Sequence, residues 1–158
     1  MLVHNIGCLM KIIGLFFGLS GRINRAQYWL TALTLYALVS GLAAVFINAH
    51  ARIGRYSLAA VSVMFLAICY SKLAVSAKRF HDRGKSGWTA LFPLAPVPIL
   101  IASELLQNEL FGLFGKLFSF GIEIWFLVEL GFLRGDIGRN RFGPDPLERH
   151  SPATHAEI

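Results

Sequence analysis

Residues 28–47 read YWLTALTLYALVSGLAAVFI, twenty consecutive residues without a charged side chain. A helix of about twenty apolar residues crosses the hydrocarbon core of a bilayer, so this stretch predicts a transmembrane helix. Three further apolar segments predict additional spans: 56–77, 88–103 and 111–133. The sequence therefore predicts four membrane-spanning helices.

The composition of the whole chain agrees with this prediction. Of 158 residues, 55% are hydrophobic and only 15% are charged, and the mean hydropathy is +0.57. A soluble domain carries about a quarter charged residues. We predict an all-α fold, an integral membrane four-helix bundle over residues 14–146, with an N-terminal extension at 1–13 and a disordered cytoplasmic tail at 147–158. The apolar run Leu9–Leu19 is too short to span and predicts a short interfacial helix or a re-entrant lead into the first span.

The third span is the least regular of the four. It contains Pro93, Pro96 and Pro98, which predict a kink or a partly unwound stretch that neighbouring helices must satisfy. A re-entrant path that does not cross the bilayer is the alternative for this segment.

Lysines and arginines are distributed unevenly between the two sides of the predicted membrane. Twelve fall on the side of the N-terminal segment, the loop after the second span and the tail, and three fall on the other side. The positive-inside rule then places both termini in the cytoplasm. The net charge of +6 is better explained by anionic lipid headgroups than by nucleic acid in so apolar a chain.

Three motifs lie on the predicted cytoplasmic side: GRINRAQYW at 21–29, KRFHDRGKSGW at 78–88 and GRNRFGPDP at 138–146. In this order they resemble the motifs of domain-of-unknown-function family 805, the YhaH-like small bacterial inner-membrane proteins. The resemblance covers roughly residues 14–146; Arg83 departs from it, standing where a small polar residue is common. It implies an inner-membrane location and no established activity. The Gly-Pro-Asp-Pro turn of the third motif should fold the chain back beneath the two basic segments.

The central motif places cations beside a tryptophan at the level of the headgroups. One hypothesis is that it binds an anionic headgroup or a phosphorylated ligand, with Asp82 orienting the cations from the same helical turn. The plainer interpretation is that the loop sets topology and caps the third span. The candidate ligand- or headgroup-binding residues of the three motifs are Arg22, Arg25, Arg79, His81, Asp82, Arg83, Lys85, Trp88 and Asn140.

The fourth span contains three ionisable residues: Lys116, Glu123 and Glu129. Lys116 and Glu123 are seven residues apart and share a helix face. A carboxyl group at the depth of Glu123 indicates either a functional site or helix association through hydrogen bonding. We expect Glu129, near the cytoplasmic end, to pair with Arg134.

His81-Asp82 is similar to the paired ligands of metal phosphohydrolases, but such centres need further ligands from other helices. The remaining histidines fall near the termini or on the opposite side of the membrane, at positions 4, 50, 150 and 155. We therefore predict no metal, no cofactor and no catalytic residues.

The sequence as a whole predicts a non-catalytic accessory or binding protein whose basic cytoplasmic face engages anionic lipid or a partner protein. A membrane-protein partner or a homo-oligomer is compatible with this prediction. One alternative is a small transporter or channel subunit that uses Glu123. Another is an enzyme acting on lipid headgroups through Arg79, His81 and Asp82.

Overall fold

The computed structural model describes residues 2–49 and 55–148, and this part of the chain is helical without β-strands. The helices are α1 (Leu2–Phe17), α2 (Arg25–Ala49), α3 (Arg55–Asp82), the 3-10 helix η1 (Gly87–Leu94), α4 (Val97–Leu105), α5 (Glu109–Phe126) and the π-helix η2 (Leu127–Phe132). The predicted all-α class is confirmed. Most of the tail predicted to be disordered, 149–158, lies outside the described residues.

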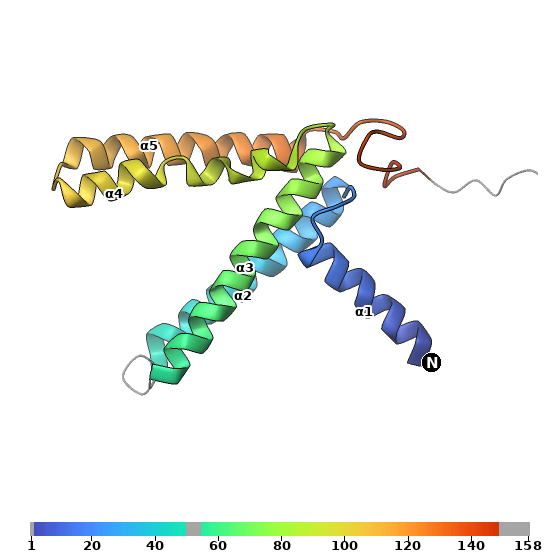
Figure 1. The fold of residues 1–158 in the computed structure, drawn as a ribbon, viewed down its shortest axis with the longest axis horizontal. Coiled ribbons are helices and arrows are strands. Elements are labelled where there is room, and N and C mark those ends of the chain that lie inside the picture. Colours follow the sequence, from blue (N-terminus) through green and yellow to red (C-terminus); the bar gives the residue numbers. More distant parts are fainter. Residues whose placement is uncertain (1, 50–54, 149–158) are drawn as a thin grey trace, which may run out of the picture.

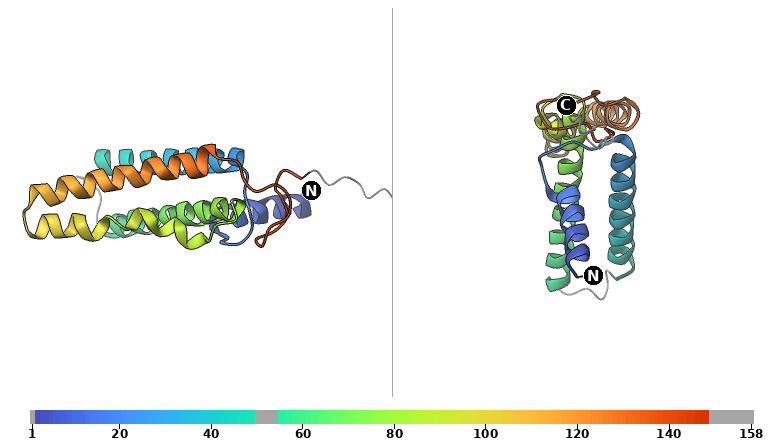
Figure 2. Two further views of the ribbon diagram at one scale, coloured as in Figure 1. Left: turned by 90° about the horizontal axis from the view of Figure 1, so that it is seen from above. Right: turned by 90° about the vertical axis from the view of Figure 1, so that its right-hand side faces the viewer.

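Two helical hairpins diverge from a shared end of the molecule (Figure 1). One pairs α2 with α3, and the other pairs η1 and α4 with α5 and η2. The contacts between the hairpins run mainly through η1 and η2, at the shared end. Seen from above, α5 lies over α2 and α4 lies over α3 (Figure 2).

Four helical segments are long and apolar enough to cross a membrane: Arg25–Ile47, Ala59–Asp82, Gly87–Leu105 and Glu109–Phe132. Between 11% and 22% of the most apolar stretch of each is buried inside the protein. Large apolar side chains such as Leu30, Leu113 and Phe120 are therefore exposed along the hairpins. Such a surface requires a lipid environment.

The third span extends along the whole of its partner helix. Pro93 lies inside η1, and Pro96 precedes α4, so the backbone continues as two successive helices beside α5. Pro93 is accommodated by the 3-10 helix, Pro96 lies in the turn that joins the two helices, and Pro98 lies in the first turn of α4.

Helix α1 begins at Leu2, earlier than the predicted Leu9–Leu19, and points away from both hairpins (Figure 1). Its attachment to α3 is polar and aromatic. The Lys78 ammonium donates to the carbonyl of Gly14, at 2.8 Å, and to that of Leu15, while the Phe17 ring stacks on Tyr70. A lysine at the last carbonyls of a helix also opposes the negative end of the helix dipole.

One face of α1 is apolar and uncovered. Ile6, Leu9, Met10 and Ile13, spaced three or four residues apart, are exposed. An amphipathic helix with an exposed apolar face is typical of a helix lying in the membrane interface.

The apolar core lies where the hairpins meet. It consists of Ala77, Phe80, Ala90, Ile122, Phe126 and Leu130. The rings of Phe80 and Phe126 pack edge to face, with centroids 5.4 Å apart. This cluster holds α3, η1 and α5 together at the shared end and brings the ends of the spans next to the three motifs.

Candidate functional site

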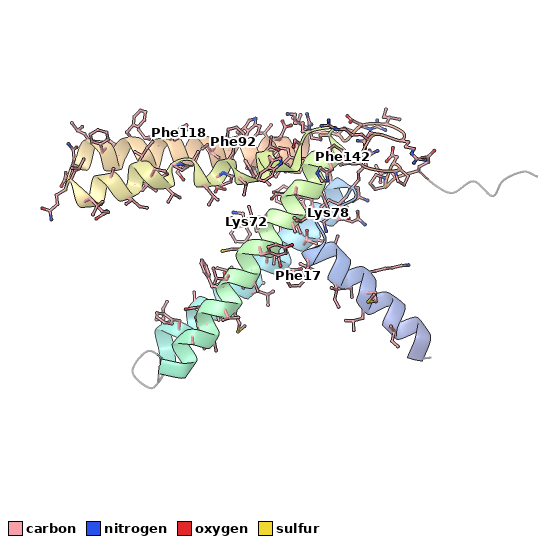
Figure 3. The ribbon with its side chains drawn as sticks, viewed as in Figure 1. Phe17, Lys72, Lys78, Phe92, Phe118 and Phe142 are labelled. Carbon is pink, nitrogen blue, oxygen red and sulfur yellow. The ribbon has the colours of Figure 1, made fainter. Side chains whose placement is uncertain are left out.

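The three sequence motifs meet at the shared end of the hairpins, and we call the residues that bond there the polar junction. Its members are Arg22, Arg25, Trp29, Arg79, His81, Asp82, Arg83, Lys85, Glu129, Asp136, Asn140 and Phe142. They come from α2 and its preceding loop, the end of α3 and the loop after it, η2 and the segment after η2. Side chains crowd together here, with Phe142 against the end of α3 (Figure 3).

Asp82 is buried between two arginines. Arg79, three residues earlier on α3, pairs with one carboxylate oxygen of Asp82, and the Nε of Arg22 lies 3.0 Å from the other. The Arg79 side chain is 0% exposed. Because buried charges destabilise a protein unless they are paired and hydrogen-bonded, this triad is a structural unit. The expected orientation of Arg79 by Asp82 is observed.

Arg22 joins the first motif to the third. Its guanidinium donates to the carbonyls of Asp136 and Gly138, both at 2.6 Å, and to that of Gly143 at 3.2 Å. The third motif therefore folds back beneath the basic segments, as its turn residues predicted.

The end of the fourth span is capped by side chains of the other motifs. The last carbonyls of a helix have no partner within the helix. Here Arg79 donates to the carbonyls of Leu130, at 2.8 Å, and Leu133, while Trp29 donates to that of Gly131 at 3.1 Å. The guanidinium of Arg25 donates to the carbonyl of Phe132, also at 3.1 Å.

These four consecutive carbonyls are thus all satisfied by side chains from the first two motifs. The sequence analysis did not predict this capping role. The acceptors are backbone carbonyls at the π-helical turn of η2, and no residue pattern predicted that turn. The only available signal was the order Arg-x-x-x-Trp at 25–29, which puts both donors on adjacent turns of one helix.

Glu129 forms a second ionic cluster, and its predicted partner was wrong. Its carboxylate pairs with Lys85 and lies 2.9 Å from the Nε of Arg83, whereas Arg134 contributes only a carbonyl, to Arg83. The reason is geometric: Glu129 lies within η2 and is 5% exposed, so it faces the loop between α3 and η1 rather than the following tail.

His81 is held by stacking. Its ring lies parallel to Phe142 with centroids 3.9 Å apart, and its Nδ1 lies 3.2 Å from the carbonyl oxygen of Gly21. The Asn140 side chain donates to the His81 carbonyl at 2.9 Å. His81 and Asp82 therefore point to different partners. Within residues 2–49 and 55–148, no three His, Cys, Asp or Glu side chains come together in a way that could hold a metal ion.

The third motif is ordered by its own carboxylate. Asp145 accepts hydrogen bonds from the backbone N–H groups of Leu147, at 2.9 Å, and Gly138, at 3.1 Å, and these bonds lower the pKa of its carboxyl group. A cavity of about 20 Å³ lies between this turn and Asp82. It has room for about one water molecule.

Four arginines at this end are exposed, and two of them, Arg25 and Arg141, donate to backbone carbonyls. We call the exposed arginines the outer rim: Arg25, Arg134, Arg139 and Arg141. In the described part of the chain, none of them forms an ion pair with a carboxylate. Arg141 donates to the carbonyl of Gly84 and lies over the Phe142 ring. Trp88, at the start of η1, is 79% exposed.

The remaining predicted residues lie away from the junction. Lys116 and Glu123 are exposed on α5. Lys116 borders an open hollow at the α4–α5 turn, together with Glu104 and Glu109.

Comparison with known proteins finds one family and relatives in Escherichia coli. The family described as "Protein of unknown function (DUF805)" matches residues 16–144. YiiR of Escherichia coli strain K12, described as uncharacterized, is 29% identical over 139 residues, which cover 86% of this chain and 90% of YiiR. Inner membrane protein YhaI of the same strain is 24% identical over 139 residues, covering 87% and 92%. No solved structure matches the chain.

Proposed function

Because the chain belongs to the DUF805 family of proteins of unknown function, we propose its role from the site alone: a non-catalytic inner-membrane protein whose outer rim binds anionic lipid headgroups. In this proposal the polar junction faces the cytoplasm, as the distribution of lysines and arginines predicts.

The observation that carries the proposal is the division of the cations into two sets. Arg22 and Arg79 are buried against Asp82 and backbone carbonyls, which leaves them closed to a headgroup. The outer rim arginines are exposed and have no carboxylate partner among the described residues. Each cation near an anionic membrane surface contributes about 1 kcal/mol of attraction.

Two neighbours of the rim support a position at the membrane surface. The indole of Trp88 is exposed, and tryptophan is enriched at the level of lipid headgroups. The C-terminal end of α1 lies near the same end of the molecule, and the exposed apolar residues of this helix would enter the interface.

A non-catalytic role is supported by the surroundings of Asp82 and His81, the two side chains that could act as a general acid or base. Asp82 is paired with two arginines, and the His81 ring is covered by Phe142. A general acid or base needs access to a substrate proton. Asp82 is buried and lacks that access, while the His81 ring is packed against Phe142 and its Nδ1 lies beside the carbonyl of Gly21.

The test is native mass spectrometry of the protein extracted gently from its own membrane. We expect wild type to retain anionic phospholipid and Arg134→Gln/Arg139→Gln to retain several-fold less. The matched control, Arg55→Gln/Lys116→Gln, removes the same charge from the far ends of the hairpins and should retain as much as wild type. Equal loss in both variants would indicate nonspecific attraction. Retention of a partner polypeptide in place of lipid would assign the rim to a protein interface.

A further inference from the structure

Two opposite charges lie beyond the polar junction within the predicted spans, one on each hairpin. Lys72 lies on α3 and Glu123 on α5, and both side chains are exposed. Neither has a hydrogen bond or an ion pair to another described residue. Lys72 projects from α3 toward the space between the two hairpins (Figure 3).

The two residues lie at similar distances from the polar junction, each measured along its own helix. Helices α3 and α5 both run toward the polar junction, and the Arg79–Leu130 hydrogen bond fixes their register there. Lys72 precedes Arg79 by seven residues, and Glu123 precedes Leu130 by seven, so each lies about 10 Å from that bond along its helix. Lys72 also shares a helix face with Arg79, which already reaches the fourth span.

Their sequence neighbours belong to one apolar cluster. Leu73 packs against the core that contains Ile122 and Phe126. Glu123 lies between these two residues of α5 and is within electrostatic range of the Tyr28 hydroxyl on α2. Lys72 and Glu123 therefore adjoin, in sequence, residues of the apolar cluster at which the two hairpins meet.

From this placement we infer that the two hairpins close on each other in the membrane and that Lys72 and Glu123 then form an interhelical ion pair. A lone charge in hydrocarbon is unfavourable, whereas a pair that faces the protein interior is tolerated. Closure would also cover apolar surface between the hairpins. The inference concerns the spans alone and is independent of any ligand at the outer rim.

Cross-linking in native membranes tests the closure. In a Cys8→Ser/Cys69→Ser background, Lys72→Cys with Glu123→Cys should be joined within one chain by a short bifunctional thiol reagent. The matched control pairs Lys72→Cys with Lys116→Cys, which lies further from the junction on the same face of α5, and should link at least fivefold less. A cross-link between two chains would show that α3 and α5 approach each other through association with a second copy, and would overturn the inference of closure within one chain. No link, or equal linking in both pairs, would also overturn the inference.

Charge exchange tests the ion pair itself. Lys72→Glu and Glu123→Lys should each lower the thermal unfolding midpoint by several degrees, because each places two like charges together. The double exchange should recover most of the loss. Additive losses would show that the two side chains do not interact.

Discussion

At the scale of single residues, the arginines of the three motifs differ in what surrounds them. Arg79 is enclosed and bonded to Asp82 and two backbone carbonyls. Arg83 is partly exposed and shares Glu129 with Lys85. Residues of one type and one motif should therefore respond very differently to substitution.

Arg79→Met should lower the free energy of unfolding by about 3 kcal/mol, since it removes one partner of a buried charge and two carbonyl caps. The matched control Arg83→Met should lose less than about 1 kcal/mol, because a partly exposed pair contributes little. Unfolding in mild detergent, followed by circular dichroism, measures both. Similar losses for the two variants would contradict the assigned roles.

Gly135 is a second sensitive position. A β-carbon at Gly135 would collide with the Asp82 carboxylate, which the two arginines hold in place. Gly135→Ala should therefore lower the unfolding free energy by about 1–3 kcal/mol. Gly41→Ala, where a β-carbon meets open space, should change it by less than about 1 kcal/mol. A tolerated Gly135→Ala would show that the triad is mobile.

Asp145 should make the third motif sensitive to acid. Its pKa is lowered by backbone N–H groups, so the stabilisation is present above the ordinary carboxyl pKa and is lost as the pH falls through the lowered value. Hydrogen exchange at Gly138 and Leu147 should accelerate only in strongly acidic solution. In Asp145→Asn the exchange should be faster at neutral pH and show no acid step. A step retained in that variant would assign it to another carboxyl group.

Sequence reasoning reached part of this site. The spacing of Arg79 and Asp82 on one helical turn predicted their pairing, and turn chemistry predicted the return of the third motif. The prediction that Glu129 pairs with Arg134 was wrong, because the η2 turn directs the Glu129 side chain toward Arg83 and Lys85. Contacts between a side chain and a distant carbonyl, such as Arg22 to Gly138, leave no trace in composition or spacing.

At the scale of elements, the end of the fourth span depends on donors from the first span. Trp29→Phe removes the N–H that caps the Gly131 carbonyl and should lower the unfolding free energy by about 1 kcal/mol. Trp88→Phe, at an exposed position, should have no measurable effect on unfolding. An equal effect of both changes would show that the capping bond is unimportant.

Apolar length was sufficient to predict the four spans, since burial in lipid depends on hydropathy more than on partners. The 3-10 form of η1 was only partly predictable: Pro93, Pro96 and Pro98 indicated an irregular span but not its geometry. The π-helix η2 was not predictable, because it depends on the carbonyl caps supplied by other helices.

At the scale of the whole molecule, the polar junction and the adjoining apolar cluster hold two hairpins at one end only. The number of spans followed from the sequence, but the divergence of the hairpins did not. Their lipid-facing surfaces carry no pattern that distinguishes lipid from a neighbouring helix. Lipid tails are as apolar as leucine, so hydropathy alone does not tell whether a helix surface contacts lipid or another helix.

We propose that the buried arginines stabilise the fold, whereas the outer rim, which has no carboxylate partner among the described residues, binds anionic headgroups. The most direct test compares Arg22→Gln with Arg139→Gln, a single-charge change at each of two positions in the motifs, on the same detergent-extracted samples. We expect Arg22→Gln to lower the thermal unfolding midpoint by several degrees, because it removes the bonds of Arg22 to Asp82 and to the third motif. Arg139→Gln should leave the midpoint unchanged and reduce the retained anionic lipid. Equal midpoints for the two variants, or lipid loss confined to Arg22→Gln, would contradict this proposal.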